Sequence, residues 1–246
     1  MDSRQYMRQR DAAGDVLSAQ QVAAHVHTDD MRAYVQKVYA WMTGGLMLTG
    51  LTAFGVASSP TILNAIFATP LYWLVLLAPL GMVFFLSARV DSMKPSTAAG
   101  TFLAYSIVNG MSFSALFLVY ELGSIFQVFL IAGGMFGVSA AYGYLTKRDL
   151  TGVGSFMFMG LIGLIIASVV NWFMDSSVLD FAISVIGVLV FTGLTAYDMQ
   201  RLRAQAVVMY SEAGLITKRA ILSALTLYLD FVNLFLFLLR LLGDRR

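Results

Sequence analysis

The chain has 246 residues, of which 59% are hydrophobic and only 12% are charged, with a net charge of +2. A soluble domain carries about 25% charged residues, so this composition excludes a soluble globular protein and favours an integral membrane protein. The apolar residues run continuously for about 20 positions at a time, unlike the ~10-residue alternating strands of a membrane β-barrel, so the predicted fold class is all-α integral membrane.

Residues 1–30 precede the first apolar stretch and are mostly polar. They contain several arginines, but also Asp11, Asp15 and Asp29, and acidic residues are avoided in organelle transit peptides. No apolar segment typical of a cleavable signal occurs before Val38. We therefore expect a flexible cytoplasmic N-terminal tail over 1–30 and a transmembrane domain over 31–246.

Seven apolar stretches follow, each long enough to cross the ~30 Å hydrocarbon core of a bilayer. They lie near residues 38–58, 69–88, 98–119, 124–145, 154–174, 179–200 and 220–242. Turn and charge signals such as Ser58-Ser59-Pro60 and Lys147-Arg148-Asp149 separate them. The sequence thus predicts seven transmembrane helices.

The basic residues predict how these helices are oriented. Every lysine and arginine before residue 240 lies in the N-terminal tail or in the second, fourth or sixth connection. Basic connections stay on the cytoplasmic side, so we expect the N-terminus in the cytoplasm and the C-terminus outside. Arg240, Arg245 and Arg246 depart from this rule, and we expect packing to hold the last helix across the membrane.

Small residues recur at helical spacing in the fourth stretch. Gly133 and Gly137 form a small-xxx-small pair, which favours close packing of membrane helices. We expect this packing to occur within one subunit, with dimerisation through the same face as the alternative.

Two aspartates interrupt the last two apolar stretches, Asp198 near the end of the sixth and Asp230 in the middle of the seventh. An ionised carboxylate at the centre of a membrane helix costs roughly 2.5–3.5 kcal/mol on insertion scales. The expected orientation places both in the cytoplasmic half, where Arg89 ends the second stretch, and a carboxylate pair with an arginine nearby is the least costly arrangement. Alternatively, Arg201 or Arg203 neutralises Asp198, and Arg89 is a snorkelling anchor.

Further polar residues occur at helical spacing in the third, sixth and seventh stretches. In the seventh they are spaced three, four and three residues apart and include Asp230, which places them on one face of the helix. We expect these three helices to share a polar interior. The candidate pore-lining residues are Asn109 and Ser112 of the third stretch, Thr195 of the sixth, and Thr226 and Asn233 of the seventh.

The segments around the aspartates carry a family resemblance. They read Phe191-Thr192-Gly193-Leu194-Thr195-Ala196-Tyr197-Asp198-Met199-Gln200 and Leu225-Thr226-Leu227-Tyr228-Leu229-Asp230-Phe231-Val232-Asn233-Leu234-Phe235. Together with Asn109-Gly110-Met111-Ser112 in the third stretch, they resemble the Bax inhibitor-1 family, also called the transmembrane Bax inhibitor motif family. The resemblance covers residues from about 31 to 243 and is nearest to the bacterial branch of the family.

The resemblance implies six helices packed around a central C-terminal helix, and a pH-sensitive calcium leak channel of the bacterial inner membrane. It implies Asp198 and Asp230 as the pH sensor, and Arg89 as a latch on the second helix. Two carboxylates in a medium of low dielectric repel and tend to share one proton, which gives pH a means to gate a pore. We expect ionised, Arg89-latched carboxylates to mark the closed form.

Calcium is expected as the permeant ion, with no cofactor. Because calcium prefers oxygen ligands, Asp198 and Asp230 are candidates for a transient calcium site. The other expected partners are protons and the lipid bilayer, and no nucleic acid.

The residues argue against an enzyme. An intramembrane aspartyl protease has Gly-x-Gly-Asp at its second aspartate, where this chain has Leu227-Tyr228-Leu229-Asp230, and the chain has no cysteine for thiol chemistry. A retinal protein needs a lysine in its seventh helix, and none lies between Arg219 and Asp244. The main alternative is a non-transporting regulator that binds a membrane protease or another membrane partner through residues 1–30 and 201–219.

Overall fold

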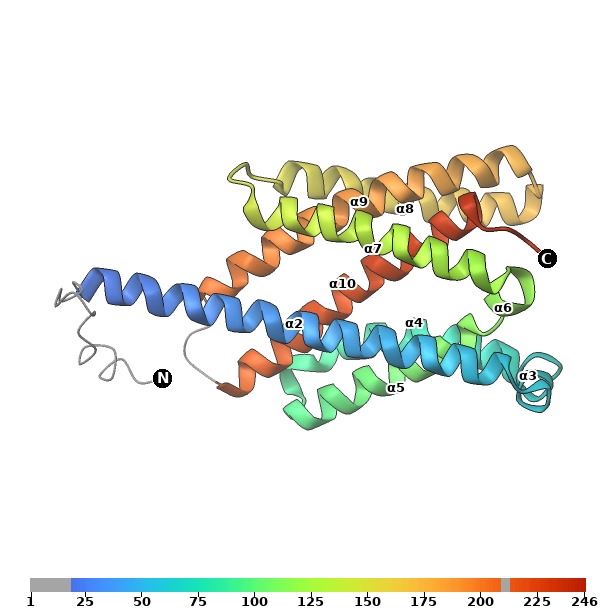
Figure 1. The fold of residues 1–246 in the computed structure, drawn as a ribbon, viewed down its shortest axis with the longest axis horizontal. Coiled ribbons are helices and arrows are strands. Elements are labelled where there is room, and N and C mark those ends of the chain that lie inside the picture. Colours follow the sequence, from blue (N-terminus) through green and yellow to red (C-terminus); the bar gives the residue numbers. More distant parts are fainter. Residues whose placement is uncertain (1–18, 209–212) are drawn as a thin grey trace.

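The structure is a computed structural model that describes residues 19–208 and 213–246, and its helices run back and forth along one direction (Figure 1). In chain order they are α2 (Ala19–Ala57), α3 (Pro60–Phe67), α4 (Leu71–Arg89), the 3-10 turn η1 (Val90–Ser92), α5 (Pro95–Phe113), α6 (Leu116–Val119), α7 (Leu122–Leu145), α8 (Thr151–Met174), α9 (Ser177–Val208) and α10 (Ala213–Leu242). Pro60 and Pro95 begin α3 and α5. Proline is suited to this first position, because a backbone N–H there would have no partner within the helix.

Seven membrane spans are present among the described residues, formed by α2, α4, α5 with α6, α7, α8, α9 and α10. They are long and apolar enough to cross a bilayer, and they coincide with the seven predicted stretches. The predicted all-α, multi-pass class is confirmed. Helix α2 begins at Ala19, within the predicted tail 1–30, and residues 1–18 of that tail lie outside the described residues.

Helix α10 lies between two groups of helices, with α2, α4 and α5 on one side and α7, α8 and α9 on the other (Figure 1). About 61% of its span is buried inside the protein, compared with at most 44% for any other span. It contacts α2, α5, α7 and α9, whereas α4 packs mainly on α5 and α8 mainly on α9. The arrangement is therefore two layers with a shared central helix, in which α4 and α8 lie on the outside.

Helices α7 and α9 approach each other closely at Gly143. A Cβ atom there would collide with the backbone carbonyl group of Ala196. By contrast, a Cβ atom at Gly133 or Gly137 would meet no atom within 4 Å. The expectation that this glycine pair packs within the subunit is therefore wrong, and Gly143 provides the close approach on this helix.

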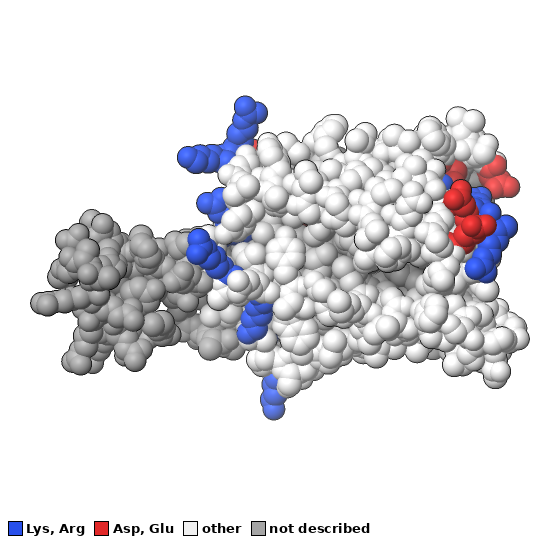
Figure 2. Space-filling model, in the orientation of Figure 1, with Lys and Arg blue, Asp and Glu red and all other residues white. Residues whose placement is uncertain are grey.

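The two ends of the bundle differ in charge (Figure 2). Lysines and arginines project at the end where α2 enters the bundle, whereas acidic and basic side chains lie together at the other end. The alternation of the seven spans places the connections α4–α5, α7–α8 and α9–α10 at the first end, and every lysine and arginine between residues 38 and 239 lies in or beside these connections. This separation of charge agrees with the pattern from which the orientation was predicted.

The C-terminal residues dock against the start of α7 at the mixed-charge end. The backbone N–H of Glu121 donates to the carbonyl oxygen of Asp244 at 3.1 Å, and that of Arg246 donates to Val119 at 3.0 Å. The N–H of Asp244 donates to the Ser124 hydroxyl at 2.9 Å. These bonds fix the C-terminal end of α10 to the neighbouring α6–α7 corner.

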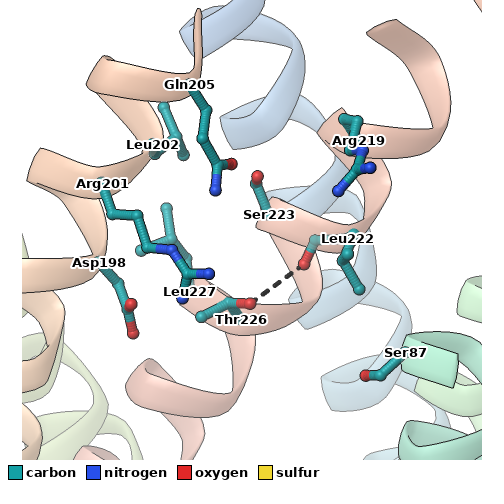
Figure 3. Close-up of a pocket in the computed structure, with 10 residues that line it drawn as sticks. All are labelled: Ser87, Asp198, Arg201, Leu202, Gln205, Arg219, Leu222, Ser223, Thr226 and Leu227. Atoms are coloured by element: carbon teal, nitrogen blue, oxygen red, sulfur yellow. Dashed lines mark hydrogen bonds between the residues drawn. The ribbon is translucent and has the colours of Figure 1, made fainter. Parts of the chain in front are cut away.

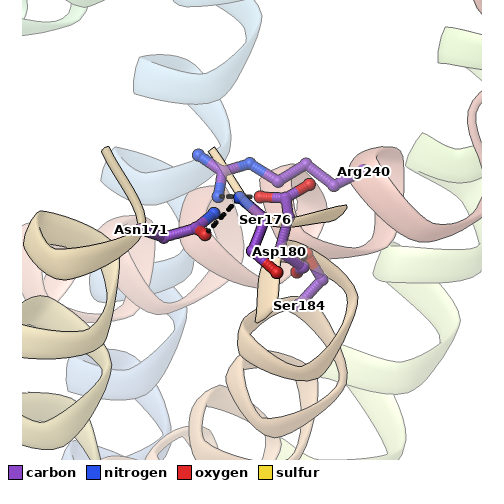
Figure 4. A network of polar contacts seen from close by, with 5 residues as sticks. All are labelled: Asn171, Ser176, Asp180, Ser184 and Arg240. Atoms are coloured by element: carbon purple, nitrogen blue, oxygen red, sulfur yellow. Dashed lines mark hydrogen bonds and ion pairs between the residues drawn. The ribbon is translucent and has the colours of Figure 1, made fainter. Parts of the chain in front are cut away.

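Two of the C-terminal arginines that depart from the positive-inside rule have partners at this end. Arg240 lies 3.8 Å from the carboxylate of Asp180, close to a hydrogen bond from the Ser176 N–H to Asn171 (Figure 4). The guanidinium group of Arg245 lies over the ring of an aromatic residue in the α6–α7 corner, 6.0 Å from its centroid. The carboxylate therefore neutralises Arg240 and the aromatic ring covers Arg245, two of the arginines that depart from the positive-inside rule.

Candidate functional site

Asp198 of α9 and Asp230 of α10 face each other in the interior of the bundle. Their carboxyl groups are joined by a hydrogen bond. Asp230 is only 4% exposed, and Asp198 is half-buried. Because two ionised carboxylates cannot hydrogen-bond directly, this contact requires one shared proton. The structure thus brings together the two aspartates that the sequence singled out.

One oxygen of this pair has no partner. Oδ2 of Asp230 is buried, and no described residue makes a hydrogen bond to it. A buried polar atom left unpaired costs about 1–3 kcal/mol in proteins, and the hydrocarbon of a bilayer offers no water to replace the missing bond. Such an atom is a feature that a purely structural role of Asp230 does not explain.

Arg201, one helical turn after Asp198, supplies positive charge beside the pair. It lies close enough for its charge to act on the Asp198 carboxylate. Both side chains line a pocket of about 240 Å³ between α9 and α10, together with Gln205 and Arg219 (Figure 3). Figure 3 shows the two arginine side chains reaching into this space from different helices. Asp198 therefore lines a polar pocket near the basic end of the bundle.

Arg89, the expected latch, lies elsewhere in this conformation. Its side chain is exposed at the end of α4, and no ion pair joins it to Asp198 or Asp230 within the described part of the chain. Ser87, two residues earlier, does line the pocket that contains Asp198. The guanidinium group that acts on Asp198 is that of Arg201, as in the alternative interpretation of the sequence.

A second buried polar cluster occupies another face of α10. The hydroxyl of the fully buried Tyr228 accepts a hydrogen bond from the Asn109 side chain at 2.8 Å and lies 2.8 Å from the Thr49 hydroxyl. Thr49 in turn donates to the carbonyl oxygen of Ser106 at 2.9 Å. Tyr228 and Asp230 are two positions apart, so their side chains project about 200° apart around the helix. This cluster was not predicted from the sequence.

The remaining predicted pore-lining residues are divided between several environments. Thr226 and Asn233 line a cavity that also contains both aspartates. Asn109 belongs to the Tyr228 cluster, Ser112 donates to a backbone carbonyl of α4 at 2.6 Å, and the buried Thr195 donates to a carbonyl of its own helix at 2.7 Å. Among the described residues, the expected polar interior of the third, sixth and seventh spans is thus divided into the Tyr228 cluster and the cavity that contains the aspartates, and α10 contributes to both.

The arrangement offers few ligands for a metal ion. Among the described residues, no group of three or more histidine, aspartate or glutamate side chains could hold one. Calcium takes six to eight oxygen ligands in stable sites. The oxygens of the aspartate pair, with Asn233 lining the same cavity, are suited to transient contact with a cation rather than to storage.

Comparison with known proteins gives consistent results along almost the whole chain. Residues 31–246 match the family described as inhibitor of apoptosis-promoting Bax1. The chain is 42% identical over 218 residues to the inner membrane protein YbhL of Escherichia coli K12, which covers 88% of this chain and 93% of that protein. It is 45% identical over 221 residues to the uncharacterized protein RP147 of Rickettsia prowazekii, with 89% and 92% covered. A protein of Borreliella burgdorferi is 40% identical over 214 residues, with 87% and 92% covered.

Proposed function

This chain belongs to the Bax inhibitor-1 family of multi-pass membrane proteins, and we propose that it is a pH-sensitive calcium leak channel of the bacterial inner membrane. The observation that carries the proposal is the contact between Asp198 and Asp230, in which one carboxylate oxygen is buried without a partner. Ionisable groups inside a membrane protein mark ion pathways and proton relays more often than purely structural positions.

In the proposed mechanism, the charge of the aspartate pair controls how α10 is held against α9. The ionised pair carries two negative charges and is held by a guanidinium group in the closed form. Protonation removes one of these charges, weakens the attraction to the arginine, and replaces the repulsion between the carboxylates with the hydrogen bond that joins Asp198 and Asp230, so that α10 moves relative to α9. Calcium ions would then pass the carboxylate oxygens in brief contacts, and calcium flux rises as the pH falls.

The proposal is tested by calcium influx into proteoliposomes between about pH 5 and pH 8. The wild type is expected to pass more calcium at the acidic end of this range. Asp230→Asn keeps the size of the side chain but cannot titrate, so its flux should no longer depend on pH.

Asp149→Asn provides the matched control for this experiment. Asp149 accepts hydrogen bonds from the Thr151 N–H and hydroxyl at 2.9 and 2.6 Å, which lower the pKa of its carboxyl group below the ordinary 3.8. It therefore stays ionised throughout the range tested and should not alter the pH response. A folded wild type that passes no calcium, or an Asp230→Asn variant that retains the wild-type response, would contradict the proposal and favour a regulator of a membrane partner.

The identity of the arginine latch gives a second prediction. Arg201→Ala removes the positive charge beside Asp198, so the ionised pair loses stabilisation and half-maximal flux should move to higher pH. Arg89→Ala, measured in the same flux assay, produces a comparable shift only if Arg89 reaches the pair in the closed form. If neither variant shifts the response, the latch is not part of the mechanism.

A further inference from the structure

A cavity of about 740 Å³ lies between α8, α9 and α10. Its walls are largely apolar and include Leu161 and Ile165 of α8 and Phe191 of α9. Asp230 and Asn233 line it from α10. This volume falls within the roughly 300–1,000 Å³ of small-molecule sites, which combine apolar walls with a few polar groups.

The cavity has an outer end at the lipid-facing surface and an inner end at the aspartates. Phe158 and Ile165, both lining it, are 59% and 57% exposed, and they lie on α8, of which only 11% is buried inside the protein. The carboxyl group of Asp230, by contrast, is buried. A ligand can therefore reach the aspartates from the hydrocarbon side of the bilayer.

The unpaired oxygen at the inner end determines which ligand chemistry fits. Oδ2 of Asp230 is a buried acceptor with no hydrogen-bond partner among the described residues, and a charge-assisted bond from an ammonium group is the strongest available kind. Arg201 also lines the cavity, but its charge acts on Asp198. A hydrated calcium ion gains nothing from the apolar walls, whereas an aliphatic or aromatic body does.

We propose that this cavity binds an amphipathic organic cation, with its ammonium group at Oδ2 of Asp230 and its apolar body between α8 and α9. The ammonium group donates a hydrogen bond to the buried acceptor, and the apolar body packs against Leu161, Ile165 and Phe191. This site goes beyond the proposed channel function, and its occupancy is measured without any calcium flux.

The test compares 4-phenylbutylamine with the neutral 4-phenylbutan-1-ol, using calorimetry on the full chain in lipid nanodiscs and empty nanodiscs as the blank. The amine is protonated at neutral pH and should bind at least about tenfold more tightly than the alcohol, because a hydrogen bond from a charged donor is stronger than one from a neutral donor. Asp230→Asn should reduce amine affinity to that of the alcohol, whereas Asp149→Asn should leave it unchanged.

A second pair of variants keeps both aspartates intact. Ile165→Trp enlarges a side chain at the outer end of the cavity and should weaken amine binding severalfold. Ile166→Trp changes the adjacent residue, which is 60% exposed and does not line the cavity, and should bind as the wild type does. Equal binding of amine and alcohol, wild-type amine affinity in Asp230→Asn, or the same affinity in both tryptophan variants would overturn the proposal.

Discussion

Gly143→Ala is expected to destabilise the fold by about 3 kcal/mol, at the upper end of the usual cost of overpacking, because its Cβ atom would collide with the Ala196 carbonyl group. The atoms in its way belong to the backbone, so no side-chain rotation can relieve the collision. Helix α9 would have to move away from α7, and Asp198 follows Ala196 by only two residues. The variant should therefore lose both thermal stability and the contact between the two aspartates.

The measurement is thermal unfolding in detergent, followed by circular dichroism. Gly137→Ala on the same helix is the matched control, since a Cβ atom there meets nothing within 4 Å. Its unfolding temperature should equal that of the wild type or exceed it slightly, because alanine favours a helix over glycine by up to ~1 kcal/mol. Similar unfolding temperatures for the two variants would mean that α7 and α9 pack differently from the arrangement described.

Tyr228→Ala is expected to cost about 3–5 kcal/mol, the usual range for truncating a large buried aromatic side chain. Tyr228 is fully buried, and its ring meets those of Phe102 and Tyr105 edge to face, with centroids 6.1 and 5.4 Å away. Its hydroxyl also joins α10 to Thr49 and Asn109. The alanine variant removes the ring contacts and the polar bonds together.

Tyr228→Phe separates these two contributions. The ring remains, but Thr49 and Asn109 each lose a partner in a buried environment, so we expect a smaller loss of about 1–3 kcal/mol. Tyr142→Ala, at an exposed position on α7, should have little effect in the same unfolding assay. A Tyr228→Phe variant as stable as the wild type would show that the hydroxyl contacts add no net stability.

The membrane spans could be predicted because their signal is local. A continuous apolar stretch of this length adopts a helix in a bilayer, because the hydrogen bonds within a helix satisfy the backbone groups of the stretch. Asp198 and Asp230 were also detectable, because ionisable groups are costly and rare at that depth. Both conclusions depend on the polarity of a segment and not on how it packs.

The residues that were not predicted, Tyr228 and Gly143, make contacts that depend on how the helices are rotated against one another. Tyr228 lies in an apolar stretch and has no sequence signal that identifies Thr49 and Asn109 as its partners. Gly143 is one of 21 glycines, and only the crossing of α7 and α9 distinguishes it from Gly137. Spacing along one helix predicts a face, but not the neighbour that this face meets.

The arginine beside the aspartates illustrates the same limit. Arg89 and Arg201 were both expected at the same end of the bundle, so the basic pattern could not decide between them. In the structure Arg201 shares a helix with Asp198 and is one turn away, whereas Arg89 is exposed at the end of the outer helix α4. A contact within one helix is set by its spacing, whereas a contact from α4 depends on the tertiary arrangement.

The central position of α10 has a consequence for how the protein is made. Synthesis proceeds from the N-terminus, so the six other spans emerge from the ribosome before the helix that both groups pack against. During that interval Asp198 lacks Asp230, Asn109 lacks the Tyr228 hydroxyl, and the surfaces that α10 covers face lipid or one another. The nascent chain should therefore be most susceptible to membrane proteases and assembly chaperones just before its seventh span inserts.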